Sequence, residues 1–238
     1  GLDYARLHRL GGYGYTGVTD QGANDAMPSD SGISILDLNT KEVKCLVSVR
    51  KVAECGVSNL SGKTHHYLTH LCLNPSSTRV AFLHRYFMPD VGMMTRLMTI
   101  GIDGSDLRCL GWGFLSHYDW KDDNRIYIYG RTGSSVDALR NNKIMQNPLV
   151  KHSIRFAKKM VKMVIGKNKG IVSGMSFLMI TDSDEPQVTA FAQGLIPYDG
   201  HPMTNPMNND WCICDTYPDT VGDRDLFLYS FSQDKRVD

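Results

Sequence analysis

The sequence predicts an all-β protein, a β-propeller of four-stranded antiparallel blades of which the chain holds about three and a half. Two observations favour this fold. A histidine, a short strand, a polar turn and an apolar β-rich strand follow one another three times, beginning at His70, His117 and His201. The first two copies lie 47 residues apart, and a period in the forties built from short strands is typical of propeller blades.

The N-terminal blade is predicted to be incomplete, with strands over 13–19, 32–38 and 43–49. Two complete blades follow, with strands over 70–75, 79–85, 96–103 and 107–110, then over 117–122, 125–131, 177–182 and 187–192. Residues 201–232 supply three strands of a last blade, which ends at a turn. The whole chain, 1–238, is thus one partial propeller domain that needs the remaining blades of its ring to close.

The second strand of a complete blade is apolar on both faces. In the stretch 125–131, Ile126 and Ile128 alternate with Tyr127 and Tyr129. A blade lies between two neighbours, so both of its faces must be apolar and a simple alternation of apolar and polar residues is not expected.

Residues 133–173 are predicted to be a helical and loop insertion within the third blade. Apolar residues recur at about a 3.6-residue period over 150–165, and basic residues occupy the rest of that helix. The insertion is either a solvated helix that covers a blade edge or a basic lid that attracts an acidic substrate.

Composition excludes two classes of partner. Lys and Arg total 26 against 25 Asp and Glu, so no net positive field favours nucleic acid. No apolar run reaches the roughly 20 residues that a membrane span needs. The six cysteines lack paired CxxC spacing and are predicted to be reduced core thiols, which slightly favours a cytoplasmic location.

Candidate chemistry begins with the repeated histidines. His70, His117 and His201 open the innermost strand of three consecutive blades, so their imidazoles are expected to converge at one mouth of the channel. The alternative is that each histidine caps its strand by bonding to a neighbouring blade. The neighbouring His65 and His66 are predicted to be loop residues.

Two arginines and the start of the last turn complete the candidate residues. Arg85 and Arg131 end the second strands of two blades, where a guanidinium could hold a carboxylate or could be an exposed charge. Asp215 and Tyr217 hold the corresponding place in the last blade, either as part of a site or as part of a hairpin turn.

The chain resembles the oligogalacturonate lyase-like branch of the TolB/WD40-like propellers over most of its length. The stretches that carry the resemblance are Gly12–Tyr15, Ser116–Trp120, Asp199–Pro202 and Asp215–Asp219. The resemblance implies a seven-bladed ring that cleaves short acidic oligosaccharides by β-elimination, with a Mn²⁺-like divalent metal at the channel mouth.

By position in that family, His70 resembles the catalytic base, and His117 and His201 resemble metal ligands. In a lyase of this kind, Arg85 or Arg131 is expected to hold a second carboxylate of the substrate. Asp215, Tyr217 and Tyr198 are then expected to contact the substrate.

The sequence departs from the family pattern in the last blade. Tyr198 and Met203 stand where the family carries a glutamine and a second histidine, and neither is a usual ligand for a hard divalent ion. Two further hypotheses therefore stay open beside a metal-dependent lyase: a non-catalytic propeller that binds a glycan or a protein, and a plain scaffold.

Overall fold

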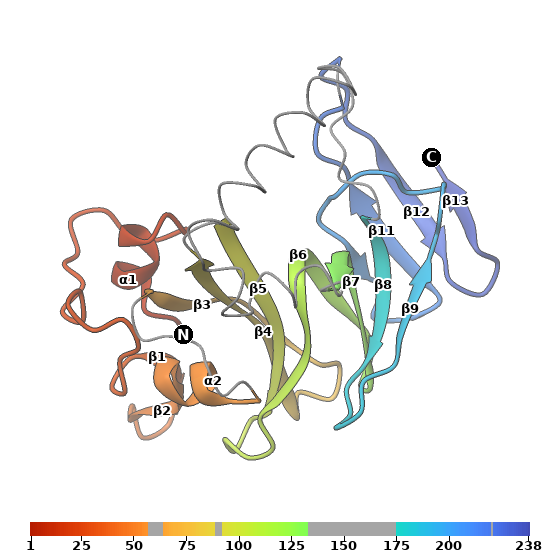
Figure 1. The fold of residues 1–238 in the computed structure, drawn as a ribbon. Coiled ribbons are helices and arrows are strands. Elements are labelled where there is room, and N and C mark those ends of the chain that lie inside the picture. Colours follow the sequence, from red (N-terminus) through yellow and green to blue (C-terminus); the bar gives the residue numbers. More distant parts are fainter. Residues whose placement is uncertain (57–63, 89–91, 133–174, 220) are drawn as a thin grey trace.

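The computed structural model describes residues 1–56, 64–88, 92–132, 175–219 and 221–238. Antiparallel sheets dominate this part of the chain, as expected for an all-β protein, and Figure 1 shows them following one another in chain order. No described helix is both long and apolar enough to cross a membrane. The predicted insertion at 133–173, with the helix predicted over 150–165, lies outside the described residues.

The N-terminal region is a two-stranded sheet with two short helices. The elements are α1 (Tyr4–Arg9), β1 (Gly32–Leu36), β2 (Val43–Ser48) and α2 (Val49–Glu54). The strand predicted over 13–19 is wrong, because this stretch forms turns and irregular backbone. Within it, Gly17 has φ 78°, a left-handed conformation that regular strands do not contain.

A seven-stranded sheet forms the centre of the molecule, and its strands pair in chain order. They are β3 (His66–Leu73), β4 (Arg79–Met88), β5 (Gly92–Gly101), β6 (Arg108–Asp122), β7 (Arg125–Thr132), β8 (Ser176–Thr181) and β9 (Val188–Phe191). His66 begins β3, so its prediction as a loop residue was wrong.

The long strand β6 belongs to both halves of this sheet. Its first part, Arg108–Gly113, pairs with β5, and its second part, Gly113–Asp122, pairs with β7. The predicted strands over 107–110 and 117–122 are therefore one continuous strand, which joins the two expected blades instead of leaving a break between them. The strand changes partners at Gly113, and its pairing with β7 has register breaks after Leu115 and after Trp120.

The last sheet has one strand more than predicted. It comprises β10 (Met203–Thr204), β11 (Trp211–Asp215), β12 (Leu226–Ser230) and β13 (Lys235–Val237), paired in that order. The stretch predicted as a closing turn is thus followed by a fourth strand, because the chain reverses at Asp234, where φ is 46°, and pairs back onto β12.

Three apolar cores lie between successive groups of strands. On β7, Ile126 and Ile128 face one core while Tyr127 and Tyr129 face the next, so the expectation of two apolar faces is confirmed. On β4, Phe82 lies in the core shared with β1, β2 and α2, and its neighbours on either side in sequence face the core shared with β6 and β7. Face-to-face packing in series therefore holds the sheets together.

Candidate histidine–arginine site

The three repeated histidines come together in the structure. The ring centroids of His70 and His117 lie 5.8 Å apart, and those of His117 and His201 lie 4.4 Å apart. His70 lies on β3, His117 lies on β6, and His201 lies in the segment just before β10. β6 is in contact with both β3 and β10. We call these residues the histidine trio.

Bulges direct the first two histidines out of their strands. His70 lies in a register break of β3 and has φ 57°, a left-handed conformation that is uncommon for residues other than glycine. His117 lies in a similar break of β6. In both cases the preceding hydroxyl lies 3.0 Å from the histidine Nδ1: Thr69 for His70 and Ser116 for His117. This shared hydroxyl–histidine dipeptide is a signal that the sequence analysis missed.

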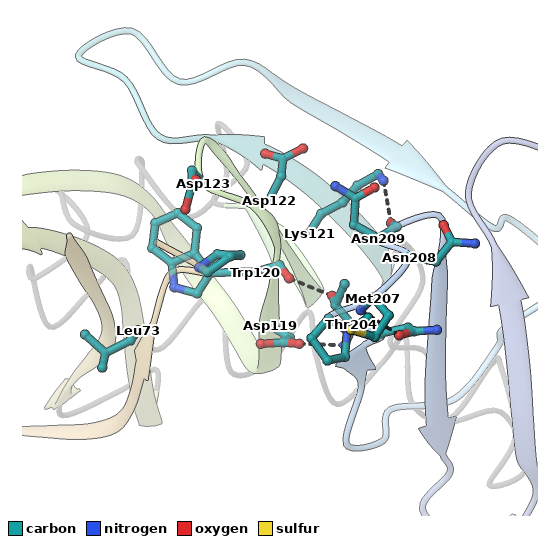
Figure 2. A pocket seen from close by; sticks show the side chains of 13 residues that line it. Leu73, Asp119, Trp120, Lys121, Asp122, Asp123, Thr204, Met207, Asn208 and Asn209 are labelled. Carbon is teal, nitrogen blue, oxygen red and sulfur yellow. Dashed lines mark hydrogen bonds between the residues drawn. The ribbon is translucent and has the colours of Figure 1, made fainter. Parts of the chain in front are cut away.

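Hydrogen bonds near the C-terminal end of β6 hold His117 in place relative to His201. Figure 2 shows this end, where a cavity of about 630 Å³ separates the turns after β3, β6 and β10. Asp119 accepts from the Thr204 backbone N–H at 2.7 Å, and the Thr204 hydroxyl donates to the Trp120 carbonyl at 2.6 Å. Lys121 donates to the Asn209 carbonyl at 2.7 Å. These contacts fix β6 against β10, and therefore fix His117 relative to His201.

Two members of the trio are bound to carboxylates. Nδ1 of His117 lies 3.2 Å from both oxygens of Asp199, and Nδ1 of His201 lies 3.0 Å from both oxygens of Asp215. An ionised carboxylate only accepts hydrogen bonds, so each Nδ1 carries the hydrogen and Nε2 keeps its lone pair while the ring is neutral. Burial alone would raise the pKa of Asp215, but the bonds from the backbone and ring of His201 lower it below its ordinary value.

His70 is the member held neutral. Its pKa is lowered to about 4, first by burial and then by the positive charge of Arg85 and the two neighbouring imidazoles. A histidine with this pKa is uncharged at pH 7, so it presents an unprotonated nitrogen that can accept a proton.

Gly200 positions the third histidine. A Cβ at this residue would lie 1.7 Å from the carbonyl oxygen of Asp215, so only glycine allows the two backbones to approach this closely. This contact places Asp199 and His201 on either side of the crossing point. Tyr217 closes the group: its N–H donates to the Asp199 carbonyl at 2.8 Å, and its ring lies 5.5 Å from His117 and 5.4 Å from His201.

The two predicted arginines occupy equivalent places in their repeats. Arg85 pairs across the sheet with Tyr67, and Arg131 pairs with Phe114, and each aromatic residue lies three positions before a trio histidine. The Arg131 guanidinium lies 4.9 Å from the Phe114 ring centroid. The Nε of each arginine is buried and has no hydrogen-bond partner among the described residues, while each arginine side chain as a whole is partly exposed.

The structure does not bring every predicted residue into the group. Tyr198 is 43% exposed and, within the described part of the chain, makes no hydrogen bond or ring contact with the trio. Conversely, Asp199 was not predicted as a site residue, although it binds His117. Its contact spans 82 residues of sequence, so no local pattern reveals it.

The donors present do not make a complete metal site. In the described ranges, no group of three or more His, Cys, Asp or Glu side chains is placed to hold a metal ion. His117 and His201 could supply two imidazole nitrogens supported by carboxylates, which is a common arrangement around metals. Met203, which stands where the family carries a histidine, is 62% exposed on β10 and offers only a thioether.

The sequence matches no known family model and no curated protein. The histidine trio and its surroundings are therefore the only indication of function in the described part of the chain.

Proposed function

We propose that this chain is part of a polysaccharide-acting β-propeller that binds an acidic oligosaccharide at the histidine–arginine site and cleaves it by β-elimination. The observation that carries the proposal is the position of His70, a neutral imidazole near the partly exposed Arg85 side chain and beside two carboxylate-bound histidines. A neutral base beside a cation is the combination needed to remove a proton next to a carboxylate.

The propeller architecture is supported by the sheet geometry. Each half of the seven-stranded sheet contains four strands once β6 is counted in both halves, and β10–β13 form a third group of four. The three groups pack face to face and in series, and their first strands carry the trio. Related residues that converge from successive groups of strands are expected when blades turn about a common axis.

Binding of an acidic ligand is supported by the arginines. A carboxylate would accept hydrogen bonds from the partly exposed guanidinium of Arg85 or Arg131, and such charge-assisted bonds are stronger than neutral ones. Asp215, Tyr217 and Tyr198 are all partly exposed beside the trio or next to its partners, and could contact sugar hydroxyls and ring faces.

The chemistry assigned to His70 is the abstraction of the proton at C5 of a uronate residue. The electron pair of that C–H bond forms the C4–C5 double bond, the C4–O bond breaks, and the leaving oxygen takes a proton from solvent. The positive charge of Arg85 at the substrate carboxylate would stabilise the negative charge that develops there. The bound anion would also offset the charge that lowers the pKa of His70, so substrate binding would make His70 a stronger base.

No step here is assigned to a metal, because the described donors stop at the two imidazoles of His117 and His201. The same observation favours a second candidate, a non-catalytic propeller that uses the site to bind a glycan or a protein. The two candidates differ in turnover and share the ligand-binding surface.

The test is a comparison of the wild type with His70→Gln in the presence of oligogalacturonides, with and without added Mn²⁺. The ultraviolet absorbance of the unsaturated product is followed over time, and ligand binding is measured separately by calorimetry. His8→Gln is the matched control, because His8 is exposed on α1 and belongs to none of these contacts.

A signal that His70→Gln loses and His8→Gln keeps would support the lyase. Binding without any unsaturated product would favour the recognition module. A wild-type protein that neither binds nor cleaves these oligosaccharides would overturn the lyase and the binding of an acidic glycan at this site.

A further inference from the structure

The hairpin between β11 and β12 continues the pairing of these strands beyond their ends. The Thr216 N–H donates to the Asp225 carbonyl at 3.0 Å, and the Thr216 hydroxyl accepts from the Asp225 N–H at 2.9 Å. In this register the next residues along the hairpin are Tyr217 and Arg224, so these two stand opposite each other. Side chains of opposite residues on antiparallel strands lie on the same face, so Tyr217 and Arg224 are neighbours.

Arginine–aromatic pairs recur in this molecule. Tyr67 pairs with Arg85 across β3 and β4, and Phe114 pairs with Arg131 across β6 and β7. The pair that contains Tyr217 is the third, and it belongs to the last group of strands. Each group of strands that contributes a histidine to the trio therefore also contributes one arginine next to an aromatic ring.

The third pair lies at the exposed end of the trio. The ring centroid of Tyr217 lies 5.5 Å from that of His117 and 5.4 Å from that of His201. Tyr217 is 44% exposed, and the His201 side chain is 57% exposed against 17% for His117. A ligand bound at the trio can therefore extend over the Tyr217 ring.

The guanidinium of Arg224 is available to a ligand. Arg224 is exposed, and within the described part of the chain it takes part in no hydrogen bond or ion pair. The neighbouring Asp225 is bound instead by Arg236, at 2.7 Å. Burial and nearby groups raise the pKa of Tyr217, and the positive charge of Arg224 opposes that rise, so the guanidinium lies close to the phenol. Arg224 thus offers an unpaired positive charge at the exposed end of the trio.

A second positive charge acts at the other end of the trio. Arg85 lies near enough to His70 for its charge to add to burial in lowering the pKa of that imidazole. His117 links the two ends, since its ring lies 5.8 Å from that of His70 and 5.5 Å from that of Tyr217. A ligand that spans the trio therefore meets one arginine at each end, and two carboxylates on that ligand would bind both.

We propose that Tyr217 and Arg224 form a second binding position for an acidic sugar. Arg224 binds the carboxylate of the uronate next to the one held at His70, and the Tyr217 ring packs against the apolar face of that sugar. The inference rests on the proposed function and narrows its substrate class to chains in which two consecutive residues carry carboxylates. A neutral chain, or one with isolated acidic residues, would leave one of the two arginines without an anion.

The test is calorimetric binding of trigalacturonate and of its fully methyl-esterified form, which keeps the sugars and removes the charges. Every protein in the series carries His70→Gln, so that no ligand is cleaved during the titration. Arg224→Gln should weaken binding of trigalacturonate by about tenfold and change binding of the ester by less than about twofold. Arg50→Gln is the control and should change neither, because Arg50 is 42% exposed and pairs with Asp25 in the N-terminal region.

A double variant distinguishes two bound carboxylates from one. Arg85→Gln and Arg224→Gln together should weaken binding of trigalacturonate by about a hundredfold, since contacts to different carboxylates add in free energy. A double variant that binds no more weakly than either single one would overturn the inference. So would an Arg224→Gln variant that binds trigalacturonate as its parent does, or that loses the acid and the ester equally. Those results leave the proposed function standing, whereas a wild type that binds no oligogalacturonide overturns both.

Discussion

Strand β3 contributes one histidine to each of two groups of histidines, and the two groups lie in opposite environments. His66, at the start of the strand, forms a dyad with His84, and both side chains are 0% exposed. His70, four residues later, belongs to the trio, which opens to solvent at His201. The same residue type therefore serves structure in one place and is available to ligands in the other, and burial together with the choice of partners makes the difference.

The dyad is part of a buried polar chain. Nδ1 of His66 lies 2.9 Å from Nε2 of His84, and Nη1 of Arg96 lies 3.4 Å from Nδ1 of His84. Because a guanidinium only donates, Nδ1 of His84 accepts and its Nε2 donates to His66. Arg96 also donates to the carbonyls of Val52 and Cys55, so these hydrogen bonds hold the end of α2 against the sheet.

The largest effect is expected when the hydrogen bonds that link Arg96, His84 and His66 are removed. Arg96→Met should lower the free energy of unfolding by about 3 kcal/mol, because it leaves buried carbonyls and His84 without their donor. Chemical denaturation measures the loss. Arg125→Met is the control, since the Arg125–Asp122 ion pair is 47% and 22% exposed and should contribute less than about 1 kcal/mol. Equal losses in the two variants would remove the distinction between the regions.

Acid should destabilise the protein through the dyad. Burial first, and then the charges of Arg96 and His66, lower the pKa of His84 well below 6.5. The unfolded chain therefore binds the proton more readily than the folded protein. The free energy of unfolding therefore has its full value above about pH 6.5. Below that pH it falls by about 1.4 kcal/mol per pH unit for each histidine whose pKa is lowered in this way.

His84→Gln keeps a polar side chain but cannot titrate, so its unfolding free energy should depend less steeply on pH between 6.5 and 5 than that of the wild type. The measurement is denaturation at a series of pH values. An unchanged slope would show that the dyad is not the acid-sensitive element.

A smaller effect is expected at the open site. Arg85→Gln should weaken binding of an acidic oligosaccharide by about tenfold, the equivalent of one charge-assisted hydrogen bond of about 1.4 kcal/mol. It should also raise the pKa of His70 from about 4, because a positive charge that lowers it is gone. Calorimetry and a proton NMR titration check these two results, with Arg50→Gln as the control. A variant that binds as the wild type does would remove Arg85 from the site.

The sequence predicted the features that repeat. The recurrence of the histidine motif placed His70, His117 and His201 at equivalent positions, and equivalent positions on adjacent strands meet in space. The alternating Ile and Tyr residues of β7 predicted two covered faces because a two-residue period maps directly onto the faces of a strand.

What the sequence did not predict depends on contacts between distant residues. Asp199 binds a histidine 82 residues away. The sequence around the dyad residue His66 resembles a polar loop, and its partner His84 lies on the adjacent strand, where it pairs with Leu68. The continuity of β6 was missed for a related reason: its bulged centre contains glycine and serine, which look like a turn in the sequence.

The central claim is that the trio, and not the dyad, meets the ligand. The most direct measurement is an NMR titration of the histidine ring signals with an oligogalacturonide at pH 7. We predict that the ring signals of His70, His117 and His201 move on binding and that the pKa of His70 rises from about 4. The ring signals of His66 and His84 should stay in place. Trio signals that do not respond to a ligand that binds would contradict it.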